Sequence, residues 1–202
     1  MDPSPRPPLR LVLGSASPRR AALLAQLGLC FEQMASHEPE PEPRFGVAEP
    51  ADFVARSAVA KALAVRRLLG DPAQTLIVAA DTVVVVDGDI AGKPADRAAA
   101  SAMLRRLSGR THEVFTGVCL LGPGDARAVG TERTRVTMLP LQEADIAWYL
   151  ASGEPFDKAG AYGIQGRGAR FIERIEGCYY NVVGLPLARL STMLTEAGYR
   201  FS

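Results

Sequence analysis

The chain has 202 residues, of which 48% are hydrophobic and 22% charged, so it is long enough to bury the core of one globular domain with one or two lobes. Its net charge of +1 excludes a general electrostatic attraction to nucleic acid or membrane, and no apolar run is long enough to span a bilayer. The three cysteines, Cys30, Cys119 and Cys178, are far apart and odd in number, which favours a reducing cytosol and no zinc site. We therefore expect a cytoplasmic protein that binds neither nucleic acid nor membrane.

The first nine residues are rich in proline and are not followed by an apolar signal core. We predict a flexible tail over residues 1–9 and a single folded domain over residues 10–202.

The folded part begins with a short apolar strand at residues 11–13, a loop of small hydroxyl residues, and a helix. Ser17 is a natural N-cap and proline suits the first helical position that follows it. Arg19 and Arg20 come next, so two guanidinium groups lie beside the positive end of the helix dipole. This arrangement indicates a phosphate site, and the alternative is an ordinary strand-to-helix turn with two solvated arginines.

A second short strand is predicted over residues 29–34, and an acidic, proline-rich loop follows at residues 37–43. Most carboxylates of that loop are expected to be solvated, and one could turn inward to hold a cation. Residues 51–69 then show the apolar period of a long helix. Lys61 lies in this helix, either on its wet face or in a site, and is one of only three lysines among the 23 basic residues.

Residues 76–86 form an apolar run typical of a central strand, and Asp81 interrupts it. Because a buried carboxylate is costly without a partner, Asp81 requires a cation, a metal or several donors; a purely structural aspartate is the alternative. The Asp-Gly pair at residues 87–88 predicts a hairpin turn, and counting back from it pairs Thr82 with Lys93. Lys93 and Asp81 would then meet in a site.

The second half of the chain predicts further elements in the order helix, two antiparallel strands, helix, glycine-rich loop, strand and helix. Their ranges are 96–107, 111–121, 128–138, 143–150, 152–168, 171–175 and 185–197. His112, at the start of a strand, is interpreted as structural. The glycines of the loop allow its backbone to approach a ligand closely.

Six different short motifs are distributed along the chain. They are Ser-Ala-Ser-Pro-Arg-Arg at 15–20, Ala-Asp-Thr-Val-Val at 80–84, Gly-Lys-Pro at 92–94, Leu-Ser-Gly-Arg-Thr-His at 107–112, Asp-Lys-Ala-Gly-Ala-Tyr-Gly-Ile-Gln-Gly at 157–166 and Asn-Val-Val-Gly-Leu-Pro at 181–186. Together they resemble the Maf family of nucleoside triphosphate pyrophosphatases, from Leu11 to about Leu194. The resemblance implies a mixed α/β fold with an elongated, twisted sheet flanked by helices, two lobes with a central cleft, and a homodimer.

The resemblance also implies metal-dependent cleavage of a nucleoside triphosphate into the monophosphate and pyrophosphate. Asp81 would act as general base or hold Mg²⁺ or Mn²⁺, with Glu40 as the second metal ligand, and Lys93 would join Asp81 in catalysis. The cationic residues would neutralise the triphosphate and the leaving pyrophosphate. The residues expected to bind substrate are Ser15, Ser17, Arg19, Arg20, Lys61, Thr82, Lys158 and Gln165.

The base preference follows from three positions. A branch of the family that resembles 7-methyl-GTP pyrophosphatases has Trp, Gln and Glu where this chain has Arg19, Thr82 and Gln165. This chain has the set of the thymidine and uridine triphosphate branch, and a neutral amide suits the acceptor–donor–acceptor edge of thymine or uracil. We therefore predict dTTP, UTP and related modified pyrimidine nucleotides as substrates.

Two other functions are compatible with parts of the sequence. The family's description as septum-formation inhibitors implies a nucleotide-binding regulator of cell division with little turnover, although a buried Asp81 gains nothing from binding a polyanion without a metal. An RNA-binding module would use the arginines, but the near-neutral charge and the absence of an aromatic stacking run disfavour it.

Overall fold

The computed structural model describes residues 9–35, 49–70 and 73–201. The predicted tail, up to residue 8, and the acidic loop at residues 37–43, which contains Glu40, lie outside the described residues.

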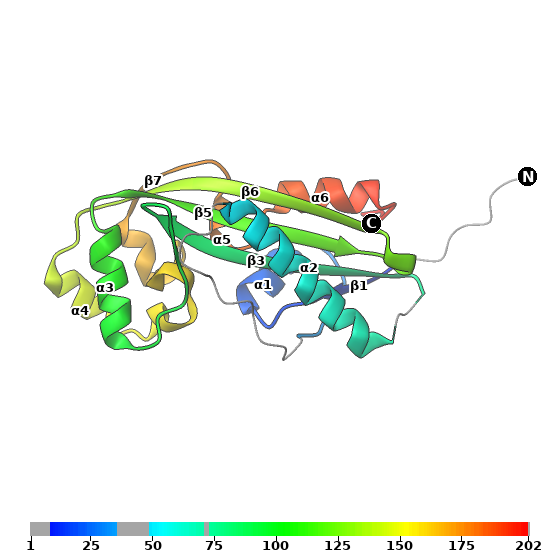
Figure 1. The fold of residues 1–202 in the computed structure, drawn as a ribbon, viewed down its shortest axis with the longest axis horizontal. Helices are drawn as coiled ribbons and strands as arrows, with labels where there is room; N and C mark the ends of the chain where they lie inside the picture. Colours follow the sequence, from blue (N-terminus) through cyan, green and yellow to red (C-terminus); the bar gives the residue numbers. More distant parts are fainter. Residues whose placement is uncertain (1–8, 36–48, 71–72, 202) are drawn as a thin grey trace, which may run out of the picture.

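Within the described ranges, the fold is a mixed α/β arrangement around a seven-stranded sheet (Figure 1). The strands are β1 (Arg10–Leu13), β2 (Glu32–Gln33), β3 (Thr75–Val86), β4 (Asp89–Ala91), β5 (Thr111–Leu121), β6 (Arg127–Met138) and β7 (Ile172–Glu176). The helices are α1 (Pro18–Gln26), α2 (Pro50–Leu69), α3 (Arg97–Leu107), α4 (Glu143–Leu150), α5 (Tyr179–Val183) and α6 (Leu187–Glu196). Short 3-10 turns are η1 (Pro123–Asp125), η2 (Glu154–Asp157), η3 (Ala159–Ala161) and η4 (Gly166–Phe171). No helix of these ranges combines the length and apolarity needed to cross a membrane.

The sheet has the order β2-β1-β3-β5-β6-β7, and β4 also pairs with β3. One edge of β3 pairs with β5 from Ile77 to Val85, and the other edge is shared by two short strands. On that second edge β1 pairs with residues 75–78 and β4 with residues 84–86. Residues 79–83 of β3 therefore have no strand partner on that edge within the described chain. This gap in the sheet is centred on Asp81.

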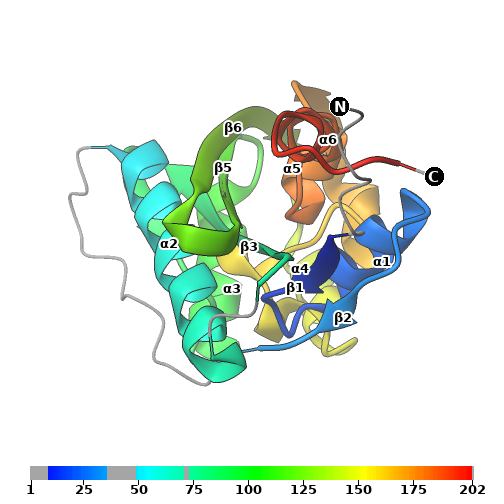
Figure 2. The same cartoon turned by 90° about the vertical axis from the view of Figure 1, so that its right-hand side faces the viewer.

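Because side chains alternate along a strand, β3 contributes to both faces of the sheet. Ile77, Ala79, Val83 and Val85 pack with α2 on one face. Even-numbered residues of β3 pack on the opposite face, with α1 and α6 at one end and with α3 and α4 at the other. Figure 2 shows α2 on one side of the sheet and α1 and α6 on the other, and Figure 1 shows α3 and α4 at the far end. The molecule thus has two lobes, and the gap in the sheet lies between them.

Glycine allows α2 to lie very close to the sheet. Gly117 of β5 pairs with Asp81 of β3, and a Cβ atom at Gly117 would lie only 2.3 Å from the Val54 carbonyl oxygen. The backbone of α2 therefore rests directly on β5. Lys61, about two helical turns beyond Val54, is brought over β3 as a result.

The predicted elements are present, with three differences. The hairpin pairs Val86 with Asp89 as expected, but β4 ends at Ala91 and the Gly92 carbonyl accepts from the Gly160 N–H instead. The predicted pairing of Thr82 with Lys93 is therefore wrong, because the ladder between β3 and β4 keeps the predicted register but ends at the Val84–Ala91 pair. The second strand is shorter than predicted, and the five-residue helix α5 was not predicted.

Candidate active site

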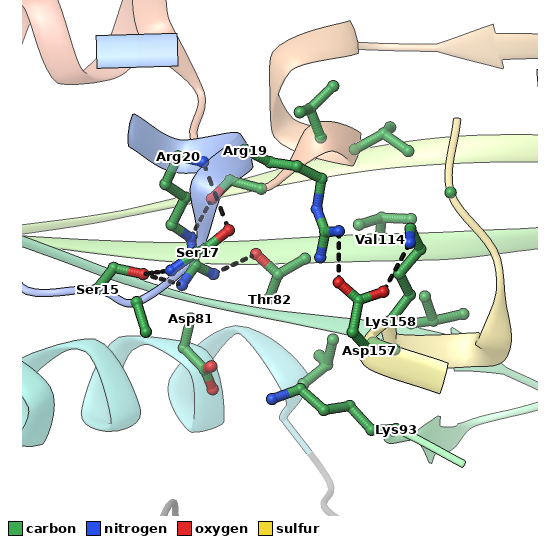
Figure 3. A pocket seen from close by; sticks show the side chains of 18 of the residues that line it. Ser15, Ser17, Arg19, Arg20, Asp81, Thr82, Lys93, Val114, Asp157 and Lys158 are labelled. Carbon is green, nitrogen blue, oxygen red and sulfur yellow. Dashed lines mark hydrogen bonds and ion pairs between the residues drawn. The ribbon is translucent and has the colours of Figure 1, made fainter. Parts of the chain in front are cut away.

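The gap in the sheet, beside residues 79–83 of β3, opens into a cavity of about 560 Å³. Its wall is built from the β1–α1 loop, α2, the middle of β3, the segment after β4 and the glycine-rich segment (Figure 3). Every predicted site residue that the structure describes lines it: Ser15, Ser17, Arg19, Arg20, Lys61, Asp81, Thr82, Lys93, Lys158 and Gln165. Five segments distant in the sequence thus meet at one place. Glu40, the other predicted metal ligand, lies outside the described residues.

The N-terminus of α1 forms one wall. Ser17 caps the helix as predicted, because its Oγ accepts from the backbone N–H of Arg20 at 3.4 Å. The Arg20 guanidinium has three further partners: Nε donates to the Gly184 carbonyl at 2.8 Å, Nη1 to Ser15 Oγ at 3.3 Å and Nη2 to Thr82 Oγ1 at 3.0 Å. Arg20 therefore joins α1, β3 and the end of α5, and its charge is held at the cavity wall.

Lys61 is the cationic partner that Asp81 was predicted to need. Its Nζ donates to Asp81 Oδ1 at 2.7 Å, and the two side chains are only 17% and 13% exposed. The alternative of Lys61 on the wet face of its helix is thus wrong. Because the Asp81 carboxylate is largely removed from water, removing Lys61 would leave its charge poorly compensated. In Figure 3 Asp81 points toward α2, away from Thr82 and Arg20.

A second ion-pair cluster spans the opposite wall, and sequence reasoning missed its central residue. Asp157 accepts from Arg19 Nη1 at 2.8 Å through Oδ2 and from Lys158 Nζ at 2.6 Å through Oδ1. Burial by itself raises the pKa of Asp157, but the hydrogen bonds from Lys158 and Arg19 outweigh it and the pKa lies below its usual value. The only sequence signal was the place of Asp157 at the start of the 157–166 motif.

The glycine-rich segment is held by a buried contact to β5. Tyr162 lines the cavity, and its hydroxyl lies 2.6 Å from Nε2 of His112, which is only 2% exposed. Burial lowers the pKa of His112 to about 4, so the imidazole is neutral at physiological pH. The interpretation of His112 as structural agrees with this contact. Ala161, just before the tyrosine, has a φ of +58°, a conformation that the packed turn imposes.

A polar chain runs from the cavity across one face of the sheet, from β3 over β5 to β6. Thr82 Oγ1 lies 2.9 Å from Thr116 Oγ1, Thr116 donates to the Asn181 carbonyl at 3.1 Å, and the Asn181 amide donates to Thr134 Oγ1 at 2.9 Å. Asn181 is fully buried. The motif at residues 181–186 therefore contacts the site at two points. Asn181 bonds to Thr116, and the Gly184 carbonyl accepts from Arg20.

The charges of the cavity favour a polyanion. Its wall carries the cations Arg19, Arg20, Lys61, Lys93 and Lys158 and the carboxylates Asp81 and Asp157. Clustered guanidinium and ammonium groups beside a helix N-terminus bind phosphate oxygens well. A carboxylate near them can accept a proton or bind a hard divalent cation.

A family model described as Maf-like protein matches residues 10–197 of the chain. The chain belongs to the Maf-like protein family. This Maf-like protein is 52% identical over 192 residues to a dTTP/UTP pyrophosphatase of Symbiobacterium thermophilum, with 94% of this chain and 95% of the relative covered. It is 50% identical over 190 residues to a dTTP/UTP pyrophosphatase of Pelotomaculum thermopropionicum, with 94% and 97% covered.

Among solved structures, the Maf-like protein is similar to a HAM1 protein from Coxiella burnetii, with a TM-score of 0.52 and 19% identity. The likeness covers 93% of this chain and 99% of that one, and it concerns the fold alone.

Proposed function

We propose that this Maf-like protein hydrolyses dTTP and UTP to the nucleoside monophosphate and pyrophosphate. The observation that carries the proposal is one cavity whose wall holds the Lys61–Asp81 pair together with four further cationic side chains, those of Arg19, Arg20, Lys93 and Lys158. The relatives named dTTP/UTP pyrophosphatase, at 50–52% identity over 94% of this chain, support the same reaction.

In the proposed reaction water attacks the α-phosphorus, the bond from that phosphorus to the bridging oxygen breaks, and pyrophosphate leaves. Negative charge grows on the leaving group, so fixed cations at the cavity wall stabilise the transition state more than the ground state. Arg19, Arg20 and Lys158 are suited to the phosphate oxygens, and Lys93 approaches from the segment after β4. Asp81 is suited to accept a proton from the attacking water.

A divalent cation fits the donor set of the described residues in a limited way. The described residues contain no group of three or more His, Cys, Asp or Glu side chains that could hold a metal ion. Within these residues, the proposed protein ligand is therefore the single carboxylate of Asp81. Mg²⁺ commonly binds through one or two carboxylates together with substrate phosphates, so one carboxylate is sufficient. In the alternative to its role as general base, we propose that Asp81 holds Mg²⁺ or Mn²⁺ with the substrate, with Glu40 as the second ligand; the cation would then neutralise charge on the phosphates and activate the water.

The base preference rests on Arg19, Thr82 and Gln165, which all line the cavity. The Gln165 amide offers both a donor and an acceptor, which matches a pyrimidine imide. The predicted homodimer and the cytoplasmic location stay predictions.

The decisive experiment is a screen of purified protein with dTTP, UTP, 7-methyl-GTP and the other nucleoside triphosphates, with Mg²⁺ and with Mn²⁺, reading pyrophosphate. We expect dTTP and UTP to be cleaved fastest and the Asp81→Asn variant to be slower by about 100-fold or more. Asp89→Asn is the matched control, since Asp89 of the hairpin pairs with Arg106 of α3 and neither residue lines the cavity.

Faster cleavage of 7-methyl-GTP would overturn the base preference, and full activity of Asp81→Asn would overturn the role of Asp81. Tight binding of dTTP without turnover of any triphosphate would instead favour the regulator of cell division.

A further inference from the structure

Among the described residues, Asp157 and Asp81 are the two carboxylates in a cavity wall that carries five cationic side chains. The two carboxylate oxygens of Asp157 accept from Arg19 at 2.8 Å and from Lys158 at 2.6 Å. One carboxylate is therefore already paired with two of the cations that would bind phosphate. Arg19 comes from α1 and Asp157 from η2, and the ion pair therefore crosses the cavity from one lobe to the other.

Lys158 does not depend on Asp157 for its position. Its Nζ also donates to the Glu154 carbonyl at 2.6 Å, and its stem packs tightly along Gly163, where a Cβ would lie 2.9 Å from Lys158 Cε. Only 14% of the Lys158 side chain is exposed, against 60% for Asp157. The lysine is thus fixed by its own segment, while the carboxylate is the accessible member of the cluster.

The bond between Asp157 and the two cations is easy to exchange. Asp157 is the exposed member of both ion pairs, and an ion pair that water and salt can reach contributes about 0–1 kcal/mol. Compared with a carboxylate, a phosphate group presents more acceptor oxygens and more negative charge to the same guanidinium and ammonium groups. A phosphate can therefore replace the carboxylate at little cost.

We propose that Asp157 is a built-in counter-ion which a phosphate of the ligand displaces, and that its competition sets how tightly the cavity retains polyphosphates. This inference rests on the proposed function. Asp157 acts through Arg19 and Lys158 and is a specificity-determining residue: it weakens the binding of pyrophosphate and so favours release of that product. Its removal strengthens the binding of phosphate-bearing ligands and leaves an uncharged nucleoside unaffected.

The test measures calorimetric binding of pyrophosphate to the wild type, Asp157→Asn and the charge-matched control Asp89→Asn, with EDTA and with Mg²⁺. We expect Asp157→Asn to lower the Kd for pyrophosphate about 3- to 10-fold, as for the loss of two weak ion pairs that share an exposed carboxylate. The gain should shrink at high ionic strength, and binding of thymidine should not change. In steady-state assays the KM for dTTP falls without a rise in kcat.

The outcomes are distinguishable. If the wild type binds neither pyrophosphate nor dTTP, the proposed function fails. If the wild type binds both but Asp157→Asn binds pyrophosphate equally or more weakly in EDTA, the counter-ion role is wrong. Weaker binding of Asp157→Asn in Mg²⁺ alone also overturns it and identifies a metal ligand, and an equal gain in Asp89→Asn reduces it to net charge.

Discussion

At the scale of single residues, the cavity is governed by the cost of removing polar groups from water. Asp81 in an apolar strand needed a partner, and the structure supplies Lys61 at 2.7 Å. His112 solves the same problem by staying neutral and sharing a 2.6 Å contact with Tyr162. Asp81 is thus compensated by an ion pair, whereas His112 is held uncharged by burial.

The neutral state of His112 predicts a pH-dependent stability. Its folded pKa of about 4 lies below the unfolded value of 6.5, so between these pH values the unfolded chain binds a proton that the folded chain does not. The free energy of unfolding should therefore fall as the pH falls from 6.5 to 4, by up to about 1.4 kcal/mol per pH unit from this residue. Urea unfolding at pH 7, 6 and 5 measures the slope.

The matched variant is His112→Gln, which keeps a polar partner for Tyr162 but does not titrate. All other groups titrate in both proteins, so the difference between the two slopes isolates His112. Equal slopes would contradict the assignment.

At the scale of elements, the contact between α2 and β5 positions the Lys61–Asp81 pair. The two backbones meet because Gly117 has no side chain, and Gly117 is the cross-strand neighbour of Asp81. The close approach of α2 at Gly117 therefore places Lys61 near Asp81.

The substitution Gly117→Ala tests this close contact between α2 and β5. A methyl group would lie 2.3 Å from the Val54 carbonyl oxygen, so α2 must move away from the sheet. We expect a loss of about 3 kcal/mol in the free energy of unfolding, measured in urea, and a loss of activity because Lys61 moves with the helix.

The control for that substitution lies on the neighbouring strand. In Gly130→Ala the new methyl group meets Arg189 Cδ at 2.9 Å, the flexible part of a side chain that can move aside. Its cost should stay below about 1 kcal/mol. Similar costs for the two substitutions would show that the approach of α2 does not matter.

At the scale of the whole molecule, the cavity joins two lobes that have separate apolar cores on either side of the gap in β3. A triphosphate that contacts Arg19 in one lobe and Lys158 in the other would tie the lobes together. Such binding stabilises the folded state by mass action.

A dUTP analogue with a non-hydrolysable bridge between the α- and β-phosphates should therefore raise the Tm. At 100 times its Kd the stabilisation is about 2.7 kcal/mol, or about 5–10 °C for a chain of this size. Amide hydrogen exchange should slow in both residues 15–20 and residues 157–165. Protection limited to one lobe would contradict a ligand that spans the cavity.

The sequence by itself determined most elements, because the spacing of apolar residues and the chemistry of caps and turns act over a few positions. Ser17 as the cap of α1, the hairpin at residues 87–88 and the need of Asp81 for a partner were all readable in this way. The residues of the candidate site were named through a family resemblance carried by six motifs.

Only the tertiary structure decided how those residues meet. It chose Lys61 as the partner of Asp81, ended β4 before Lys93 could pair with Thr82, and placed Asp157 between Arg19 and Lys158. The physical reason is that the cavity exists where two short strands leave part of one edge of β3 uncovered and where a helix rests on a glycine. Both depend on contacts between segments tens of residues apart, which no local pattern of side chains encodes.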